Sequence, residues 1–433
     1  MNNMLHRERG TIRSRGYYIL VSIFVLLLFY LCILTRNTTD YSTHTNSMAN
    51  LDIRSLINPI SMIEYLIKNG YPLWHITGRI VMGLIKCPAE YAAGISSGIW
   101  MILSYIGSLK LLQYFFFHHS KLSEEIESIN QTEIYNRRID IVLPILVFCL
   151  FIVAPVWLPW KYEFIIFHVG GINVWHNATN ICGRAVGIFA FYYSMKLIDQ
   201  IVESNYTYYP SVYKCIGLSI IYLLSLLAKP SFAQTFVPAF GILLIYLLIK
   251  SKFKFSKHFL LFCVLAILPI IKLCLQTVYY FGTVPGSEGI KTQSAEEGII
   301  FLWPSISLVF DAIKKQLLVL LFPLIMFLIS IYENKKIDRY WAISFLMFAI
   351  GVFYVLSLKG AAAGEMGWAL YIAAFFVFMI SIRDYFGLFF SDHIFCTSKH
   401  SAMLTISTIA LVEQCITGGY YLYELVIKGA KRF

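Results

Sequence analysis

The sequence predicts an all-α fold, in which a polytopic membrane protein crosses the bilayer about eleven times. Three observations predict it. The chain of 433 residues is 58% hydrophobic and only 14% charged, whereas a soluble domain carries roughly a quarter charged residues. Apolar runs long enough to span a bilayer recur from end to end. Basic residues cluster in the short loops between these runs, which is the mark of cytoplasmic loops.

The formal charge of +11 therefore reflects the orientation of the loops across the membrane, and we expect no nucleic-acid partner. The nine cysteines are mostly single residues inside apolar runs, with no CxxC pair, so we interpret them as small hydrophobic side chains. The first apolar run is long and no small-residue cleavage site follows it, so we expect it to stay as an anchor. Residues 1–433 are expected to form a single integral-membrane domain with no soluble part.

The N-terminal stretch is rich in arginine, which predicts a cytoplasmic start. The first span, Gly16–Leu34, then delivers Arg36–His44 to the outer side. In a helix, Asp40 and His44 would share one face because they lie four residues apart. A carboxylate at the outer rim of a bilayer, beside an imidazole, suits proton removal from a sugar hydroxyl. The alternative is a helix cap at Asp40 and an ordinary rim residue at His44.

Residues 46–85 predict amphipathic helices in the outer interface, with a break at Asn58–Pro59. Whether the short apolar stretch Pro72–Ile85 crosses the bilayer decides the topology. If it crossed, the basic clusters Lys250–Lys257 and Lys335–Arg339 would both lie outside. If it stays interfacial or re-entrant, both lie in the cytoplasm. The loop-charge rule strongly favours the second arrangement.

On that count ten spans follow the first one. They are expected near Ala93–Phe117, Ile139–Trp157, Ala178–Ile198, Ser211–Ala228, Phe232–Lys250, Phe259–Leu275, Gln316–Tyr332, Tyr340–Leu358, Trp368–Ile382 and Ala402–Tyr423. The longest outer loop is expected at residues 277–315. Its glycines and proline predict flexibility, and we interpret it as a candidate lid over an outer site.

Polar residues gather just before and inside the expected span at Ala178–Ile198. His176 precedes it, and Asn177 suits an N-cap. Arg184 would lie about two helical turns inside the membrane, which is costly unless it faces a cavity or an anion. A phosphate is the natural partner for its guanidinium fork. The alternative is a structural ion pair between Arg184 and Asp40 or Glu365.

Two further charged residues are expected at the outer rim. Lys229 ends a span; such a lysine is more often a snorkelling residue, and here it is also a candidate second phosphate contact. Glu365 lies between Gly364 and Gly367, where a compact backbone allows close approach to a ligand. The alternative for Glu365 is a solvated loop acid. The chain contains no GxxxxGK[ST] phosphate loop, no HExxH zinc helix and no GxSxG elbow.

With these features, the chain resembles the C-type glycosyltransferases (GT-C) of bacterial surface-polysaccharide clusters. The likeness covers nearly the whole chain and rests on the order and placement of short motifs. They are an aspartate and histidine after the first span at Asp40 and His44, the stretch Pro72-Leu73-Trp74-His75, the stretch Trp175-His176-Asn177-Ala178-Thr179 with alanine in place of the usual proline, and Lys229-Pro230-Ser231.

This resemblance implies a multi-pass enzyme of the plasma membrane that moves a sugar, with inversion, from a polyprenyl-phosphate carrier to a lipid-linked or cell-surface glycan on the outer face. It implies that Asp40 is the general base and that Arg184 with Lys229 holds the donor phosphate. Other residues would bind substrate: His44, His75, His176, Asn177 and Glu365. Some members hold a divalent metal, but Thr39 stands where a second acid usually occurs, so no metal or other cofactor is expected.

Two other functions stay open at this point. A polymerase or ligase joining lipid-linked repeat units would use the same compartment. Such proteins depend on arginines in large outer loops, however, and residues 277–315 contain three lysines and no arginine. A lipid or glycan transporter would need polar residues along a path through the whole membrane, whereas the inner halves of the expected spans are almost wholly apolar.

Overall fold

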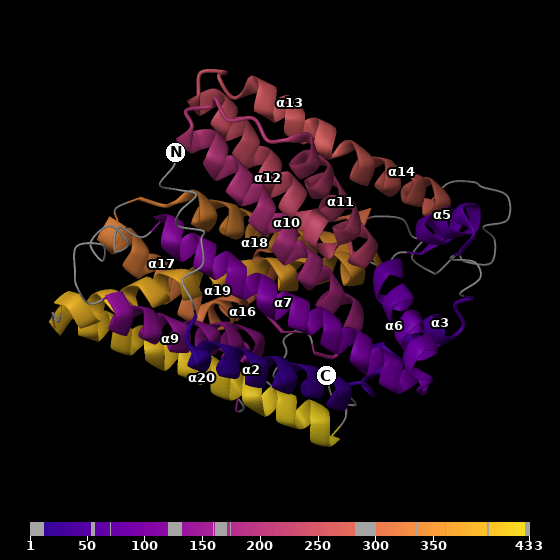
Figure 1. The fold of residues 1–433 in the computed structure, drawn as a ribbon, viewed down its shortest axis with the longest axis horizontal. Coiled ribbons are helices and arrows are strands. Elements are labelled where there is room, and N and C mark those ends of the chain that lie inside the picture. The colour runs from indigo at the N-terminus through magenta and orange to yellow at the C-terminus, as the bar shows by residue number, and fades with distance from the viewer. Residues whose placement is uncertain are drawn as a thin grey trace.

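Helices make up nearly all of the computed structural model of this chain (Figure 1). The structure describes residues 13–52, 57–69, 71–119, 132–158, 160, 171–173, 175–281, 300–334, 336–359, 361–395 and 398–428. Within these ranges the side chains of residues 39–40, 117–119, 132–137, 276–281, 300–301, 334, 359, 361–366, 391–395 and 428 are left undescribed.

The first long helix is tied to a distant one by a single carboxylate. Helix α2 (Arg15–Leu34) begins after Ser14, whose hydroxyl accepts a hydrogen bond from the backbone N–H of Tyr17. Asp140 of α9 (Thr132–Ile152) pairs with Arg13 at 2.7 Å and accepts from the Ser14 N–H at 2.7 Å. The starts of α2 and α9 therefore lie on the same side of the bundle.

Three short helices follow α2, as the sequence predicts. They are α3 (Thr39–Ala49), α5 (Pro59–Lys68) and α6 (Pro72–Ile85). Figure 1 shows α3 and α6 beside one end of α7 (Ala89–His119), and α5 beside the end of α14 (Ile267–Phe281). The break at Asn58–Pro59 is confirmed, because the Asn58 side chain caps α5 by accepting from the Ile60 N–H. Helix α6 has 14 residues, or about 21 Å at ~1.5 Å per residue, which is shorter than the hydrocarbon core.

The centre of the bundle is formed by α7, α10 (Ala178–Glu203) and α19 (Ala361–Phe395). Of the apolar window in α19, 83% is buried, compared with 11% in α2. Around this centre lie α11 (Val212–Ala228), α12 (Ser231–Lys250), α13 (Ser256–Leu265), α14 (Ile267–Phe281), α16 (Ile306–Val319), α17 (Leu321–Asn334), α18 (Arg339–Ser357) and α20 (Ser398–Lys428). Two short strands, β1 (Ile300–Phe301) and β2 (Leu358–Lys359), pair antiparallel with Ile300 opposite Lys359.

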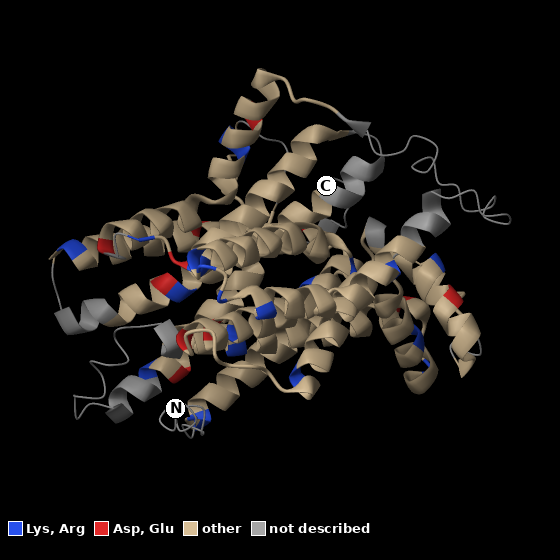
Figure 2. Cartoon of the chain, turned by 90° about the horizontal axis from the view of Figure 1, so that it is seen from above, with Lys and Arg blue, Asp and Glu red and all other residues tan. Residues whose placement is uncertain are grey.

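The described chain contains eight helices long and apolar enough to cross a membrane, or nine if the bent pair α16–α17 counts as one span. The protein is therefore a polytopic helical membrane protein, and uncharged residues dominate its helices in Figure 2. The expected eleven spans also include α9 and the 17-residue apolar helix α11. That higher number stays a prediction.

Two expected features differ from the structure. The span expected at Gln316–Tyr332 is not straight, because α16 and α17 meet at an 80° bend. The Gln414 side chain of α20 fills this break: it donates to the carbonyl oxygen of Val319 and accepts from the N–H of Phe322. A distant amide thus replaces the hydrogen bonds that a continuous helix would make for itself.

The loop expected at residues 277–315 is shorter in the structure. Helix α14 continues to Phe281, and α16 already begins at Ile306, where the hydroxyl of Ser305 accepts from the Leu308 N–H. This serine cap, which the loop assignment overlooked, starts the helix. Residues 282–299, the rest of the candidate lid, lie outside the described residues.

The helix ends gather on two opposite faces of the bundle. We call one face the rim: here α2, α11 and α18 end, while α10, α12 and α19 begin. We call the other face the basic end: here α10 and α12 end and α18 begins. At the basic end Arg339 pairs with Asp199 at 2.9 Å and Arg383 with Asp338 at 2.7 Å, so α10, α18 and α19 are joined there by charge.

Candidate active site

Helices α3 and α6 bring two histidines into contact at the rim. His75 Nδ1 lies 2.9 Å from the carbonyl oxygen of Tyr71, so this nitrogen must carry the proton and donate. His75 Nε2 is then an acceptor for His44 Nδ1, which lies 3.2 Å away. His44 Nδ1 therefore carries the proton of this neutral imidazole, and His44 Nε2 is left as a proton acceptor.

Burial keeps this histidine pair neutral. Burial is the main cause that lowers the pKa of His44 to about 3, and the nearby His75 and Lys229 lower it further. Burial also lowers the pKa of His75 to about 4, although its hydrogen bond to Tyr71 opposes this shift. Both imidazoles are therefore uncharged at neutral pH and can only exchange hydrogen bonds, not supply positive charge.

Helix α6 is held against α7 by its tryptophan. Trp74 is fully buried, and its Nε1 donates to the Ser97 hydroxyl at 3.0 Å. The Trp74 ring also contacts the rings of His44 and Tyr41 edge to face. The tryptophan thereby fixes the position of the neighbouring His75 relative to α3.

Lys229 lies where four elements meet. It follows the last residue of α11 and is 2% exposed. Its Nζ donates to the Thr179 hydroxyl of α10 at 3.2 Å and lies 5.0 Å from the ring centres of both Tyr71 and Trp368. Gly183 allows this approach, because a Cβ there would lie 2.9 Å from Lys229 Cβ. The two ring faces stabilise the ammonium group.

The residues just before α10 contact α19 and α20 at the rim. His176 Nδ1 lies 2.8 Å from the Tyr421 hydroxyl of α20, and the His176 ring centre is 5.8 Å from that of Trp368. Asn177 caps α10, since its Oδ1 accepts from the Asn180 N–H at 2.9 Å and from the Thr179 hydroxyl at 3.0 Å. The predicted capping role of Asn177 is thus confirmed.

Arg184 lies on α10 as predicted, about two turns from its start, and is only 4% exposed. Its Nη1 donates to Asn173 Oδ1 at 2.7 Å, and its guanidinium carbon lies 4.7 and 4.9 Å from the ring centres of Phe151 and Phe375. Among the described side chains it forms no ion pair, and its Nε has no acceptor. Within the described residues, the buried guanidinium of Arg184 therefore has only neutral partners.

Arg184 and Lys229 approach α10 from different sides. Lys229 packs along Thr179 and Gly183, whereas Arg184 continues the stripe that contains Asn180. Asn180 is 1% exposed, and neither atom of its side-chain amide has a partner in the described part of the chain. This orphaned amide, one turn from Arg184, was missed from the sequence; its spacing of four residues from Arg184 was the available signal.

The two candidate acids lie near the starts of helices at the rim. Asp40 is the second residue of α3, one turn before His44, and Glu365 lies near the start of α19, one turn before Trp368. Their side chains lie outside the described residues. Among the described residues, no three His, Cys, Asp or Glu side chains gather as a metal site would require.

Sequence reasoning also missed three aromatic residues of the rim. Tyr71 and Trp368 flank Lys229, and Tyr421 contacts His176. Their proximity to the glycine-bounded loop and to the histidine motif was a weak signal for Trp368 and Tyr71. No local signal marks Tyr421, which is 245 residues from His176.

No protein-family model matches this chain, and a search of curated proteins finds no match. The site must therefore be interpreted from its own geometry. A polar rim joins two neutral histidines, a caged lysine and a set of aromatic rings, with a buried arginine beneath it. Such a surface can hold a sugar by stacking and hydrogen bonding and an anionic group by charge.

Proposed function

We propose that the protein is an integral-membrane glycosyltransferase. It moves a sugar from a polyprenyl-phosphate donor to a lipid-linked or cell-surface glycan on the outer face of the plasma membrane. The observation that carries the proposal is the meeting of α3, α6, α10, α11 and α19 at one rim around Lys229, with the His44–His75 pair beside it. A lipid-borne donor suits a site at the membrane surface with no soluble domain.

The orientation of the bundle supports an outward-facing rim. Lys250, Lys252, Lys254 and Lys257 lie at or beyond the end of α12, at the basic end, and Arg339 begins α18 there. Loops rich in lysine and arginine stay in the cytoplasm. The rim, at the opposite face, is then on the outer side, where polyprenyl-phosphate sugars serve as donors.

In the proposed reaction Asp40 takes the proton from the acceptor hydroxyl. The hydroxyl oxygen attacks the anomeric carbon, and the bond from that carbon to the phosphate oxygen breaks. The bond electrons leave with the polyprenyl phosphate, so one displacement inverts the configuration. Lys229 offsets the charge of the leaving phosphate, and Arg184 adds positive potential from below. His44, His75, His176, Asn177 and Glu365 complete the substrate contacts.

The test is transfer by the purified chain in detergent, supplied with polyprenyl-phosphate sugars and a lipid-linked glycan fraction. Asp40→Asn keeps the size of the side chain but removes the base, and we expect transfer to fall ~100-fold or more. Glu64→Gln is the matched control, because Glu64 is an exposed acid on α5 paired with Lys68. Its transfer should equal the wild-type rate.

Wild-type transfer by Asp40→Asn would remove the general base from this assignment. Product size separates the proposal from the polymerase alternative. Addition of a single sugar supports a transferase, whereas a ladder of repeat units would assign the protein to the polymerases or ligases. Absence of transfer with every donor, in a protein that still folds, would overturn the proposed function as a whole.

A further inference from the structure

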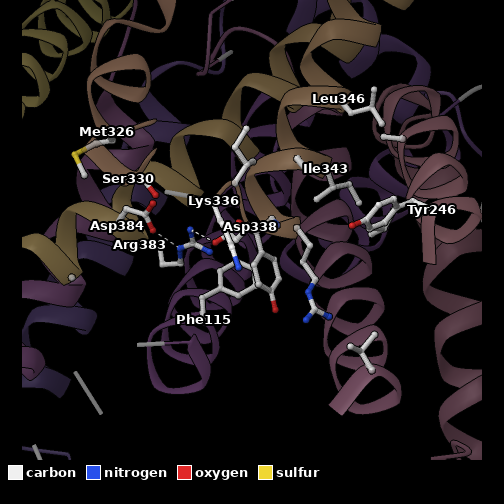
Figure 3. A pocket seen from close by; sticks show the side chains of 18 of the residues that line it. Phe115, Tyr246, Met326, Ser330, Lys336, Asp338, Ile343, Leu346, Arg383 and Asp384 are labelled. Carbon is white, nitrogen blue, oxygen red and sulfur yellow. Dashed lines mark hydrogen bonds and ion pairs between the residues drawn. The ribbon is translucent and has the colours of Figure 1, made fainter. Parts of the chain in front are cut away.

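A second site lies at the basic end, away from the rim. A cavity of about 970 Å³ opens there between α12 and α18, with walls that also come from α7, α10, α17 and α19. Figure 3 shows charged side chains at one side of it, among them Arg383 and Asp338, and apolar side chains such as Leu346 at the other. The cavity is therefore amphipathic.

Most charges at the polar side are already paired. Arg383, which is 7% exposed, bonds Asp338 at 2.7 Å and Asp384 at 2.6 Å. Arg339 pairs with Asp199, and Glu333 pairs with His400. These contacts join α18 to α10 and α19, and α17 to α20. Each carboxylate of the cavity has a basic partner, but Asp338 and Asp384 share one arginine.

Two basic side chains of the cavity lie outside these ion pairs. Lys250 and Lys336 line the cavity, and neither forms an ion pair with another described side chain. The polar side of the cavity thus offers two lysines to an anion.

The apolar side of the cavity leads from these lysines along the helix surface. Ile242, Tyr246 and Lys250 line it at intervals of four residues, which places them in one row on α12. Ile242 and Tyr246 are 51% and 54% exposed, so this row faces the surroundings of the bundle. Eight residues of helix cover ~12 Å, which carries the row from the charged end well into the hydrocarbon depth.

We propose that this cavity binds an anionic phospholipid of the inner leaflet. Its phosphate lies between Lys250 and Lys336, and an acyl chain lies along Ile242 and Tyr246. Along α12, positive charge lies at the helix end and exposed apolar side chains follow toward the membrane interior. An anionic phospholipid has the same arrangement, with its headgroup at the surface and its acyl chains inside. The proposal goes beyond the proposed function, because no step at the rim requires it.

The test is lipid retention by the purified full-length protein, measured by native mass spectrometry. The protein is titrated with phosphatidylglycerol and with phosphatidylcholine of the same acyl chains. We expect phosphatidylglycerol to bind at least tenfold more tightly. The double variant Lys250→Ala/Lys336→Ala should lose this preference. The control Lys254→Ala/Lys257→Ala, which removes two exposed lysines outside the cavity at the same end, should keep it.

A second variant tests the apolar arm. Ala342 lines the cavity from α18 and is exposed, so Ala342→Trp fills space there without entering the core. It should weaken phosphatidylglycerol binding about tenfold. Equal binding of both lipids by the wild type, or undiminished binding by the lysine variant, would overturn the proposal. Displacement of the lipid by millimolar glycerol phosphate would also overturn it, since the site would then be one for soluble anions.

Discussion

At the scale of residues, neutral and charged groups at the rim have separate tasks. The Tyr71 carbonyl fixes the proton on His75 Nδ1, and this orders the donor and acceptor sites of His44. The positive charge is supplied by Lys229, which stays between two aromatic rings. A rim arranged in this way presents hydrogen bonds and charge at different points, as the proposed phosphosugar donor would require.

The histidine pair predicts an acid-sensitive fold. Since burial lowers the pKa values of His44 and His75 to about 3 and about 4, the unfolded chain binds protons first as the pH falls below ~6.5. Stability is then complete above that pH and declines toward pH 4, by at most ~1.4 kcal/mol per pH unit for each histidine. The double variant His44→Gln/His75→Gln should show a flatter dependence of melting temperature on pH between 7 and 5.

The groups that face His44 are His75 and Lys229, with Asp40 one turn earlier on α3. Thermal unfolding in detergent at several pH values gives the measurement. If the double variant loses stability in acid as steeply as the wild type, the pair is not the source of the acid sensitivity.

Arg184 predicts a separation of folding from donor binding. Within the described part of the chain, all partners of its guanidinium are neutral. Replacing Arg184 by the apolar Met should therefore change the free energy of unfolding by less than about 1.5 kcal/mol. The polyprenyl-phosphate sugar should raise the melting temperature of the wild type, and Arg184→Met should lose this shift. Arg184→Lys should retain part of it, because it keeps the charge but not the fork.

The opposite result would assign Arg184 a structural task. Asn173, its hydrogen-bond partner, also donates to the carbonyl oxygens of Leu150 and Val153 at the end of α9. If Arg184→Met melts far below the wild type without donor, the arginine acts through this contact, by fixing Asn173 and the end of α9.

At the scale of elements, the bend between α16 and α17 depends on α20. The side-chain amide of Gln414 forms hydrogen bonds on both sides of the bend. The backbone carbonyl oxygen of Gln414 accepts from the Ala154 N–H at 3.0 Å. The segment after α9 therefore lies directly against α20. This close backbone contact is possible because the next turn of α20 contains Gly418, which faces the carbonyl oxygen of Ile152.

Gly418 offers a test of this junction with a control at the adjacent position. A Cβ at Gly418 would overlap the Ile152 carbonyl oxygen, a backbone atom that cannot move cheaply. Gly418→Ala should therefore destabilise the protein by ~2 kcal/mol or more. A Cβ at Gly419 meets nothing within 4 Å, so Gly419→Ala should melt at or slightly above the wild-type temperature. Equal melting temperatures for the two variants would show that the junction tolerates a wider spacing.

At the scale of the whole molecule, the bundle has two chemically different faces. The rim combines aromatic rings with histidines and Lys229. The basic end combines ion pairs with two lysines that form no ion pair within the described residues. Ion pairs join α10, α18 and α19 at the basic end, whereas hydrogen bonds and ring contacts join the helices at the rim.

The two faces predict a labelling pattern. In a variant without the nine native cysteines, a single cysteine in place of Lys254 should react only with reagents that enter the cytoplasm. A single cysteine in place of Ile63, which is 58% exposed on α5, should react with a membrane-impermeant reagent added outside. Labelling of position 254 from outside would reverse the orientation and move the rim to the cytoplasmic side.

The sequence by itself determined the class of protein and most of its helices. Apolar length predicts the long helices, and local signals predict where several begin, including Asn58 before Pro59 and Asn177 before α10. It also selected Lys229 and the histidines as rim residues, which the structure brings near one another. These features depend on contacts within a few residues, and such contacts can be predicted from local order.

Only the tertiary structure decided which helices are neighbours. Trp368 lies against Lys229, Tyr421 against His176, and Gln414 inside the bend of a helix pair more than ninety residues away. The charged cavity at the basic end likewise combines six helices. Apolar helices of similar composition can pack against one another in many orders, so no local pattern specifies these partners. They follow from complementary shapes and paired polar groups across the packed bundle.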